Sequence, residues 1–388
     1  MPSFLQADAD IHINNIRTAA PQYMSGFADL TIRGHILFNL MREYGMFEFN
    51  ATSASTIYQM QVREPEVRTS NDTTRKVFQN SNVFEQCQVG IRWYEATDML
   101  SEIQWKENQG KTQLVNLYES KMKNLGTAMT RRLQEWSYRD GNAAPYTDGF
   151  QGFESCLAAA SGTVAADRIA LPDDSYAGHN TDLENFGGTW SSDLSPGDRL
   201  SAGLTNDWPY GSGTSNYDAF SPLLLNWSST SFGSGSGLWE DNVEEVLREG
   251  SAIMQGKNGF MNTSDVPVVY LMAPNLYVKA KNFYSQRFRM MAPYRDGEVG
   301  FPSQGSISID GVVLKSDWAC PANVFYGLCP QHMEMFWMIC RNASGENPMI
   351  DVDGPIWDTP TASYLMRVAA GGNLRMQPKF MIKGANYA

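Results

Sequence analysis

The sequence predicts an α+β fold in which a long β ribbon leads into a longer helix. Between about Ala54 and Trp93, apolar residues alternate with polar ones at the period of two that is typical of half-buried strands. After a turn expected near Asp98, apolar residues recur from about Trp105 to Tyr138 at the spacings of three and four that mark one face of a helix. Later segments combine buried strands with flanking helices, as α+β folds do.

The ribbon has two arms and a polar tip. The apolar positions of the arms are Tyr58, Met60 and Val62 going out, and Cys87, Val89, Ile91 and Trp93 coming back. The tip runs from Arg63 to Asn82 and has almost no apolar residues to hold it against a core. Because an isolated two-stranded ribbon is only marginally stable in water, we expect other subunits to cover it.

The same tip supplies most of the candidate contact residues. We predict inter-subunit salt bridges and hydrogen bonds through its charged side chains: Arg63, Glu66, Arg68, Asp72, Arg75 and Lys76. A second basic cluster lies at Lys279, Lys281, Arg287, Arg289 and Arg295, with no acid until Asp296. Arg287 and Arg289 of that cluster are further candidates for binding a neighbour's carboxylates. A solvated helix face would explain the cluster equally well.

The helix is amphipathic and long. Its apolar stripe is Leu114, Tyr118, Met122, Leu125, Met129, Leu133 and Trp136. Its opposite face is charged: Lys121, Lys123, Arg131, Arg132 and Glu135. From Trp105 to Tyr138 it would span roughly 50 Å at 1.5 Å per residue. A coiled coil or an ordinary core helix would carry a similar stripe.

Composition excludes several classes of protein. With 388 residues, 42% of them hydrophobic and 19% charged, the chain has the length of two or three globular domains. A net charge of −12 argues against tight, direct DNA binding, which needs an excess of Lys and Arg. Residues 1–20 lack the pattern of a secretory signal, and no apolar run approaches a membrane span. We therefore expect synthesis and folding in a cytoplasm.

The sequence offers no catalytic, cofactor or metal site. It lacks nucleophile-elbow, phosphate-loop, metalloprotease-helix and dinucleotide-binding motifs. Its 4 histidines are dispersed, and its 5 cysteines are odd in number and lack CxxC spacing, so we expect buried free thiols. Asp351 to Gly354 begins like a calcium loop, but Pro355 and the missing later ligands argue against one. We predict that the protein is not an enzyme.

The first ~35 residues have little periodicity and are typical of an arm that lies along a partner. Residues 172–237 are rich in Gly, Ser, Asn and Asp and predict an elaborated insertion of loops and short strands. Several aromatic residues in and beside that stretch need burial: Trp190, Trp208, Tyr217, Phe220, Trp227 and Trp239. A helix is predicted from about Asp241 to Gln255, with acidic residues in its first turn.

The remaining elements alternate between strands and one helix. A buried strand from Val266 to Met272 leads through Pro274 into a helix, because proline is tolerated in a first turn. Asp310-Gly311 predicts a two-residue hairpin between strands that contain Ile307 and Ile309, and Val312 and Leu314. Further strands are predicted at Val324–Leu328, Met333–Ile339, Tyr364–Ala369 and Leu374–Ile382, the last two separated by Gly371-Gly372.

This order of elements resembles the major capsid proteins of tailed bacteriophages, which share the Hong Kong 97 fold. The stretch Val268 to Tyr277 is similar to the strand-to-helix segment of the family's axial domain, and Asp310 to Val313 to its common hairpin. The segment Val324 to Leu328, followed by His332-Met333, and the C-terminal pair of strands are also similar to the family.

The resemblance implies a division of the chain. An N-terminal arm would occupy residues 1–45, the extended β-hairpin loop 46–95, and the peripheral domain with its spine helix 96–149. The axial domain would occupy residues 150–347, with the insertion at about 172–237. Residues 348–388 would return to the peripheral domain. The extended loop would lie over the adjacent subunit.

The resemblance also implies a function and partners. The chain would be a structural virion protein that assembles with itself, as hexamers and pentamers, into an icosahedral shell around double-stranded DNA bound without sequence specificity. A scaffolding protein, a portal and a decoration protein would be further partners, and no membrane would be involved. The virion would be its location, after assembly in the host bacterial cytoplasm. Nothing here resembles the long helical scaffolding segment of some members, so we infer a separate scaffold or a processed product.

Covalent cross-linking is not expected. The type member of the family joins a loop lysine to a neighbour's asparagine. Lys76 is the only lysine of the loop here, and no motif matches its partners.

Other functions remain compatible with the sequence. An encapsulin-like compartment shell would have the same fold around a cargo enzyme. The 10 Trp and the Gly-, Ser- and Asn-rich middle also fit a carbohydrate-active enzyme or a lectin, since a glycosidase needs only two carboxylates at a set separation. A tail or decoration component is a further alternative and would form tubes or trimers.

Overall fold

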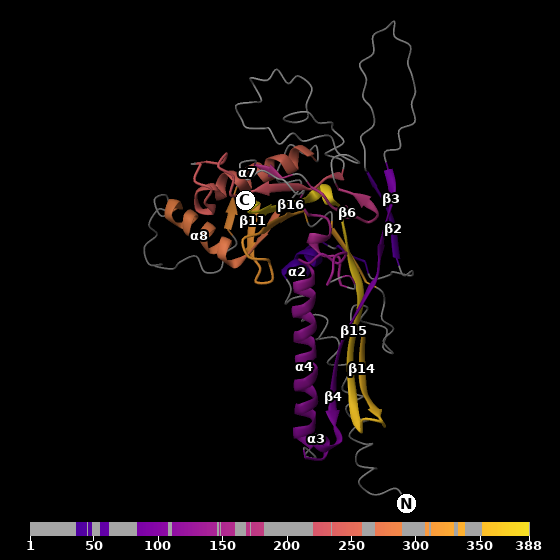
Figure 1. The fold of residues 1–388 in the computed structure, drawn as a ribbon. Helices are drawn as coiled ribbons and strands as arrows, with labels where there is room; N and C mark the ends of the chain where they lie inside the picture. Colours follow the sequence, from indigo (N-terminus) through magenta and orange to yellow (C-terminus); the bar gives the residue numbers. More distant parts are fainter. Residues whose placement is uncertain are drawn as a thin grey trace, which may run out of the picture. The chain divides into compact units, whose positions relative to one another are not determined.

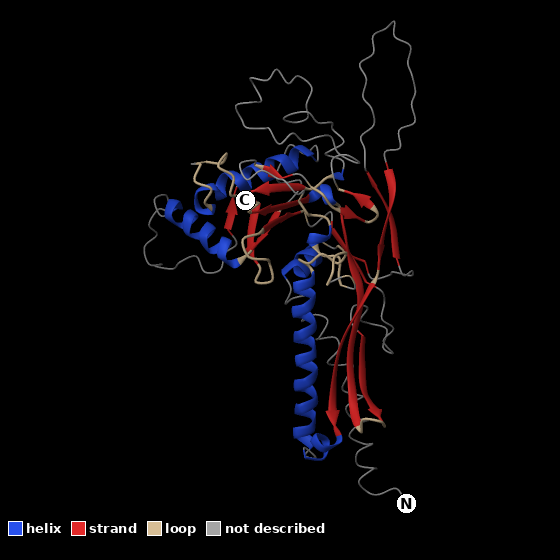
Figure 2. Ribbon diagram, viewed as in Figure 1, coloured by secondary structure: helices blue, strands red, loops and turns tan. Residues whose placement is uncertain are grey.

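The computed structural model describes residues 36–44, 46–48, 55–61, 84–107, 111–145, 147, 149–159, 168–170, 172–181, 220–233, 235–257, 268–288, 307–309, 312–329, 333–337 and 351–387. Its helices and sheets confirm the predicted α+β class (Figure 2). The chain forms two units, which are described separately. Unit 1 comprises Met1–Thr56, Val89–Gly152 and Glu334–Arg375, and unit 2 comprises Ile57–Gln88, Phe153–Met333 and Met376–Ala388.

A five-stranded sheet forms the framework of unit 1. Its strands are β1 (Phe47–Glu48), β4 (Arg92–Ser101), β13 (Met333–Trp337), β14 (Asp351–Asp358) and β15 (Ser363–Met376). The order is β1-β13-β15-β14, and β4 also pairs with β15. The pairs of β15 with β4 and β14 are antiparallel, whereas β1 and β13 are parallel.

The long helix of unit 1 is α4 (Lys111–Trp136), which runs alongside β4 and β15 (Figure 1). Leu125, Met129 and Leu133 of the predicted stripe are buried, so the amphipathic pattern is confirmed for these turns. The 26 residues of α4 span roughly 39 Å. The sequence predicted one helix from Trp105 to Tyr138, whereas the structure has two separate helices there. The first is α3 (Glu102–Glu107), which begins directly after β4, and the second is α4.

Four details of unit 1 differ from the predictions. Within the expected arm 1–45, residues Ile36–Glu43 form helix α2, which the sequence did not predict, and Leu37, Phe38, Leu40 and Met41 are buried. The preceding residues lie outside the described part of the chain. The turn expected near Asp98 is also wrong, since β4 continues to Ser101 and belongs, with Trp93, to the five-stranded sheet.

The other two differences concern glycine and proline. Gly371 and Gly372 do not separate two strands but lie inside the 14-residue strand β15. Strand β14 was not predicted, because Gly354 and Pro355 are poor strand formers. The register between β14 and β15 shifts between Asp353 and Ile356. Gly354 and Pro355 therefore lie at a bulge, where sheets accommodate glycine and proline.

Unit 2 contains a mixed seven-stranded sheet of order β10-β11-β9-β12-β16-β8-β5. Its strands are β5 (Ile169–Ala170), β8 (Leu223–Asn226), β9 (Val269–Met272), β10 (Ile307–Ile309), β11 (Val312–Ser316), β12 (Phe325–Leu328) and β16 (Met381–Ala385). Helices α7 (Trp239–Lys257) and α8 (Pro274–Phe288) pack on the sheet (Figure 2). Short helical turns lie at η1 (Phe153–Ser155) and η3 (Pro378–Phe380).

The core of unit 2 is aromatic. Trp239 lies between Trp227 and Phe325, with ring centroids 5.8 and 5.4 Å away, and its indole N–H donates to the carbonyl of Leu276. Burial of Trp227, Trp239 and Phe220 confirms the need predicted for these side chains. The other aromatic residues predicted with them lie outside the described residues.

Several local predictions for unit 2 are confirmed. The strand and helix around Pro274 are β9 and α8, and the Asp241–Gln255 helix is the longer α7. Ile309 pairs with Val312, as a two-residue hairpin requires. Two long-range features were not predicted. β8 is a fully buried strand of the main sheet inside the expected insertion, and β16 pairs with β12 and β8 rather than with the sheet of unit 1.

Candidate assembly surfaces

Most of the charged residues predicted to make inter-subunit contacts lie in segment 62–83, outside the described residues: Arg63, Glu66, Arg68, Asp72, Arg75 and Lys76. Arg287 lies near the end of α8, but its side chain is not described, and Arg289 lies outside the described residues. The contacts expected for the tip therefore stay a prediction. The strands on either side of segment 62–83 are described.

The base of the predicted ribbon is a hairpin of β2 (Ser55–Gln61) and β3 (Phe84–Gly90). Its inward side chains Met60, Cys87 and Val89 are buried, whereas Ile57 and Phe84 are each 59% exposed. This base therefore has a core beneath it, which corrects the expectation that the ribbon lacks one. Burial of these apolar side chains stabilises the base of the hairpin, which would be only marginally stable as an isolated two-stranded ribbon in water.

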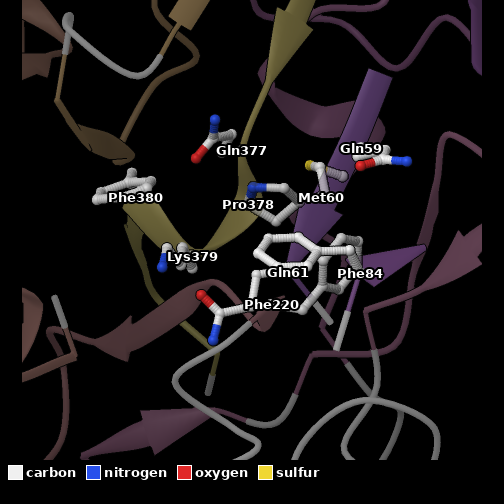
Figure 3. Close-up of a pocket in the computed structure, with 9 residues that line it drawn as sticks. All are labelled: Gln59, Met60, Gln61, Phe84, Phe220, Gln377, Pro378, Lys379 and Phe380. Atoms are coloured by element: carbon white, nitrogen blue, oxygen red, sulfur yellow. The ribbon is translucent and has the colours of Figure 1, made fainter. Parts of the chain in front are cut away.

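A cavity of about 210 Å³ lies in unit 2 between this hairpin and the segment that precedes β16 (Figure 3). Phe84, Phe220, Pro378 and Phe380 form its apolar lining, and glutamines with Lys379 form the polar part. The lining carries no acid or histidine, so Lys379 is its only titratable side chain.

The sheet of unit 1 presents an apolar strip on the face opposite α4. Met99, Leu365 and Ile356 are direct register partners across β4, β15 and β14, and they are 58%, 39% and 53% exposed. Side chains directly opposite each other in a sheet lie about 5 Å apart, so the three form one continuous patch. Contiguous apolar patches on a surface mark interaction sites more often than isolated residues do.

Charged side chains separate this apolar strip from an exposed aromatic residue, Trp93. Arg367 forms an ion pair of 3.8 Å with Glu95 on the same face, next to the Met99–Leu365 pair. Trp93 follows along the strand and is 60% exposed. On the helix side of the sheet, Lys121 of α4 forms an ion pair with Asp98, 3.0 Å apart. Lys121, which the sequence places on the charged face of the helix, therefore contacts the sheet.

Sequence reasoning missed the apolar strip for two reasons. The turn assigned near Asp98 removed Met99 from β4, and the Gly354-Pro355 bulge concealed the strand that carries Ile356. The alternation of Trp93, Glu95, Thr97 and Met99 in the sequence was the signal that could have placed the first of these residues.

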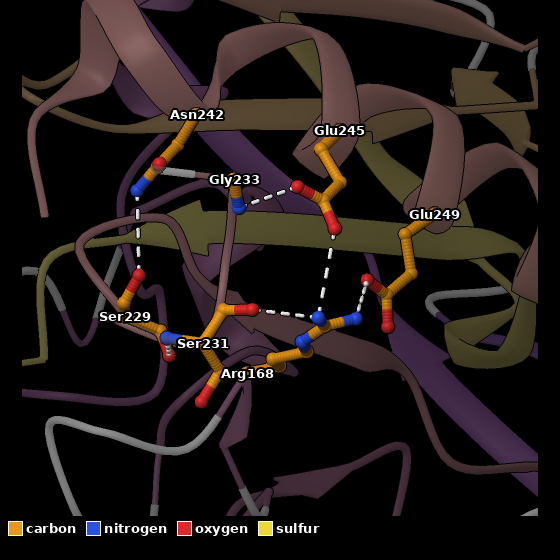
Figure 4. Close-up of polar contacts among 7 residues, drawn as sticks. All are labelled: Arg168, Ser229, Ser231, Gly233, Asn242, Glu245 and Glu249. Atoms are coloured by element: carbon orange, nitrogen blue, oxygen red, sulfur yellow. Dashed lines mark hydrogen bonds and ion pairs between the residues drawn. The ribbon is translucent and has the colours of Figure 1, made fainter. Parts of the chain in front are cut away.

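Two carboxylates in unit 2, those of Glu245 and Glu249, lie beside one arginine (Figure 4). A glycosidase would need two carboxylates that are free to act on a substrate. Arg168 lies 3.0 Å from Glu249 and 3.5 Å from Glu245, and it donates to the carbonyl of Ser231. Glu245 also accepts the backbone N–H of Gly233. Both carboxylates are thus engaged by one guanidinium and a loop, an arrangement that fastens the segment after β8 to α7.

Other chemistry finds no support among the described side chains. No three His, Cys, Asp or Glu residues there are grouped closely enough to hold a metal ion. Cys87, Cys156, Cys320 and Cys329 are buried free thiols, as predicted. Burial raises the pKa of the Cys87 thiol to about 11 and that of Cys329 to about 12. Such thiols are poor nucleophiles at neutral pH.

Among the described helices, none combines the length and the apolar character needed to cross a bilayer.

Solved structures resemble this chain in fold. The capsid asymmetric unit of cyanophage A-1(L) matches with a TM-score of 0.53 at 10% identity, over 89% of this chain and 92% of that chain. The chain has the Hong Kong 97 fold. The likeness at this identity concerns the fold, and it agrees with the long helix beside a sheet, the hairpin and the second mixed sheet.

Two further structures align with this Hong Kong 97-fold chain. The capsid of an empty GTA particle gives a TM-score of 0.48 at 8% identity, over 90% of each chain. The capsid of the myovirus phage XM1 gives 0.43 at 12% identity, over 88% of this chain and 90% of that chain. No protein-family model matches the sequence, and a search of curated proteins found no match.

Proposed function

We propose that this chain is a structural shell protein that assembles with itself into a phage capsid. The observation that carries the proposal is the Hong Kong 97 fold over 89% of the chain, which it shares with the capsid subunit of cyanophage A-1(L). Its role is structural rather than catalytic. An enzyme or a lectin gains no support from the described side chains, whose paired carboxylates are held by Arg168.

Surface composition supports self-association. Met99, Leu365 and Ile356 form a registered apolar strip, and the hairpin β2–β3 carries a long polar segment beyond its base. A subunit that binds through two different surfaces makes heterologous contacts, which close into rings when the rotation allows it. Hexamers and pentamers arranged in an icosahedral shell are the assemblies that we propose.

The division into domains follows the same fold. We propose that unit 1, with α4 as its spine, is the peripheral domain and that unit 2, with the seven-stranded sheet, is the axial domain. The hairpin β2–β3 would be the base of the extended loop.

The proposed partners follow from a shell. We propose that the assembled protein encloses double-stranded DNA without sequence-specific contacts, consistent with a net charge of −12. A separate scaffolding protein, a portal and a decoration protein would complete the particle. The protein would be located in the virion, after assembly in the bacterial cytoplasm.

Electron microscopy of purified recombinant protein tests the proposal, with analytical ultracentrifugation over a range of concentrations. Capsomers or closed shells, formed with or without a co-expressed scaffold, are the expected result. Protein that stays monomeric at high concentration under both conditions would contradict it. Shells that enclose a cargo enzyme instead of DNA would identify an encapsulin-like compartment, and tubes or trimers a tail or decoration component.

A further inference from the structure

A second, very short hairpin lies against the base of the β2–β3 hairpin in unit 2. Strands β6 (Ser175–Tyr176) and β7 (His179–Asn180) pair through Tyr176 and His179, with Ala177 and Gly178 between them. Both central residues have positive φ, 53° for Ala177 and 90° for Gly178. Two-residue hairpins of this type require positive φ at both positions, which glycine adopts freely and alanine does not.

The strained alanine makes a specific contact. Its carbonyl accepts the backbone N–H of Gln88 in β3, with N and O 3.5 Å apart. Next to it, His179 Nε2 lies 3.0 Å from the carbonyl oxygen of Gln86. Because a carbonyl can only accept, Nε2 must carry the proton and donate. The two contacts satisfy backbone groups two residues apart, which point to the same edge of β3.

The histidine is held in place from other sides. Its Nδ1 lies 3.4 Å from a carboxylate oxygen of Glu85, and its ring meets that of Phe220 edge-on at 6.3 Å. The hairpin itself is anchored. The buried hydroxyl of Tyr176 accepts the N–H of Met376, and Asp174 accepts the backbone N–H groups of Ala158 and Ser175.

These contacts cover the edge of β3 that β2 leaves unpaired. An uncovered edge would accept another strand, and a two-stranded hairpin held on neither edge has a poorly defined direction. Strain at one residue, with its carbonyl used for a single contact, is a pattern found at functional positions. A turn that served only to reverse the chain would carry Asn or Gly at position 177 and avoid the strain.

We propose that the β6–β7 turn, through the Ala177 carbonyl and the His179 imidazole, fixes the direction in which the extended hairpin leaves unit 2. Ala177 and His179 are positioning residues, because they act through β3 and not on a partner. The consequence for the size and uniformity of the shell rests on the proposed function. The consequence for the hairpin itself does not.

The experiment compares three chains: the unchanged protein, His179→Ala, and His179→Gln, whose side-chain amide can still donate to the Gln86 carbonyl. Hydrogen exchange followed by mass spectrometry reports on peptides that cover 84–90, with peptides that cover β8 as the internal reference. We expect His179→Ala to speed exchange in 84–90 about tenfold while β8 stays unchanged, and His179→Gln to restore slow exchange.

The same three chains are then assembled and imaged. We expect uniform shells from the unchanged protein and from His179→Gln, and a mixture of sizes or open sheets from His179→Ala. Unchanged exchange in 84–90 would show that the β6–β7 turn does not hold the hairpin. Equally faster exchange in β8 would also overturn the proposal, because it would show a general loss of stability. Altered exchange with unaltered shells would overturn its role in assembly. If the unchanged protein gives no shells at all, the proposed function fails. The exchange result still decides whether the β6–β7 turn holds the hairpin.

Discussion

The indole ring of Trp93 lies directly over the backbone of Gly371, its register partner on the neighbouring strand β15. A Cβ added at Gly371 would come within 2.8 Å of Trp93 Cζ3 and 2.9 Å of Cε3. The glycine is therefore required by a close approach and not by a turn. Aromatic side chains that cover a glycine on the next strand stabilise sheets in this way.

Gly371→Val tests this relationship through the sign of its effect. Valine favours strands more than glycine does, so it would stabilise an uncovered position. With the indole ring above it, we expect the free energy of unfolding to fall by about 1 kcal/mol. In a Trp93→Ala background the same substitution should become neutral or stabilising. Urea denaturation of the four chains measures the coupling, and additive effects would show that the ring and the glycine are independent.

A second prediction concerns the ion pair between Lys383 of β16 and Glu154 of η1. The two charged atoms lie 2.6 Å apart, with side chains 12% and 24% exposed, and the Tyr326 hydroxyl donates to the same carboxylate. Lys383→Met leaves that carboxylate poorly compensated, so we expect a loss of about 2–3 kcal/mol in urea denaturation. Lys383→Met combined with Glu154→Gln should recover part of it. A single variant as stable as the unchanged protein would contradict the prediction.

Alkaline pH should weaken the fold through the buried thiols. Burial raises the pKa of Cys87 from 9.0 to about 11, so between these values the thiol ionises in the unfolded chain but stays protonated in the folded one. The unfolded state then binds fewer protons, and stability falls as pH rises through this window.

Cys87→Ala provides the comparison for that effect. We expect its free energy of unfolding to fall less steeply between pH 9.0 and about 11, with a difference in slope of up to about 1.4 kcal/mol per pH unit. Denaturation in the presence of a reducing agent measures both slopes. Identical slopes would show that Cys87 does not contribute.

The apolar strip of unit 1 gives a test of assembly. Leu365→Lys places a charge between Met99 and Ile356 on an exposed face, so we expect nearly unchanged folding and at least about a tenfold higher concentration for shell formation. Leu365→Met keeps the strip apolar and should assemble normally. Light scattering against concentration measures the onset. Normal assembly of Leu365→Lys would exclude the strip from subunit contacts.

The polar tip of the hairpin gives the last prediction. Arg68→Glu and Arg75→Glu reverse charges that we expect to bind carboxylates of neighbouring subunits. Shell closure should be impaired in both variants. The free energy of unfolding of the monomer should stay within about 0.5 kcal/mol of that of the unchanged protein in thermal denaturation, as for most surface substitutions. Arg68→Lys and Arg75→Lys are the matched controls. Equal loss of monomer stability and of shells would indicate an internal role instead.

Local sequence patterns predicted local structure well. The stripe through Leu125, Met129 and Leu133 gave the buried face of α4, and Asp310-Gly311 gave the pairing of Ile309 with Val312. In each case the interacting residues are close in sequence, so a repeat of 3.6 or 2 carries the information. The family's order of elements added the fold as a whole.

The failures share a different cause. Gly371-Gly372 looked like a strand boundary because glycine alone is a poor strand former, yet Trp93 covers one of the pair. Gly354 and Pro355 looked incompatible with a strand, yet a bulge accommodates them. The base of the β2–β3 hairpin looked unsupported, yet it has buried side chains and a turn across its edge. Pairing or packing with another segment decided each of these positions.

The sequence by itself determined most of the described strands and helices and which of their faces are apolar. Only the tertiary structure decided that β15 pairs with β4, so that the Tyr94 hydroxyl donates to the Gly372 carbonyl across 278 residues, and that β16 joins the sheet of unit 2. Periodicity encodes the face that a segment buries but not the segment that covers it. Register and partner follow from shape and hydrogen bonding between distant segments, which exist only once the chain has folded.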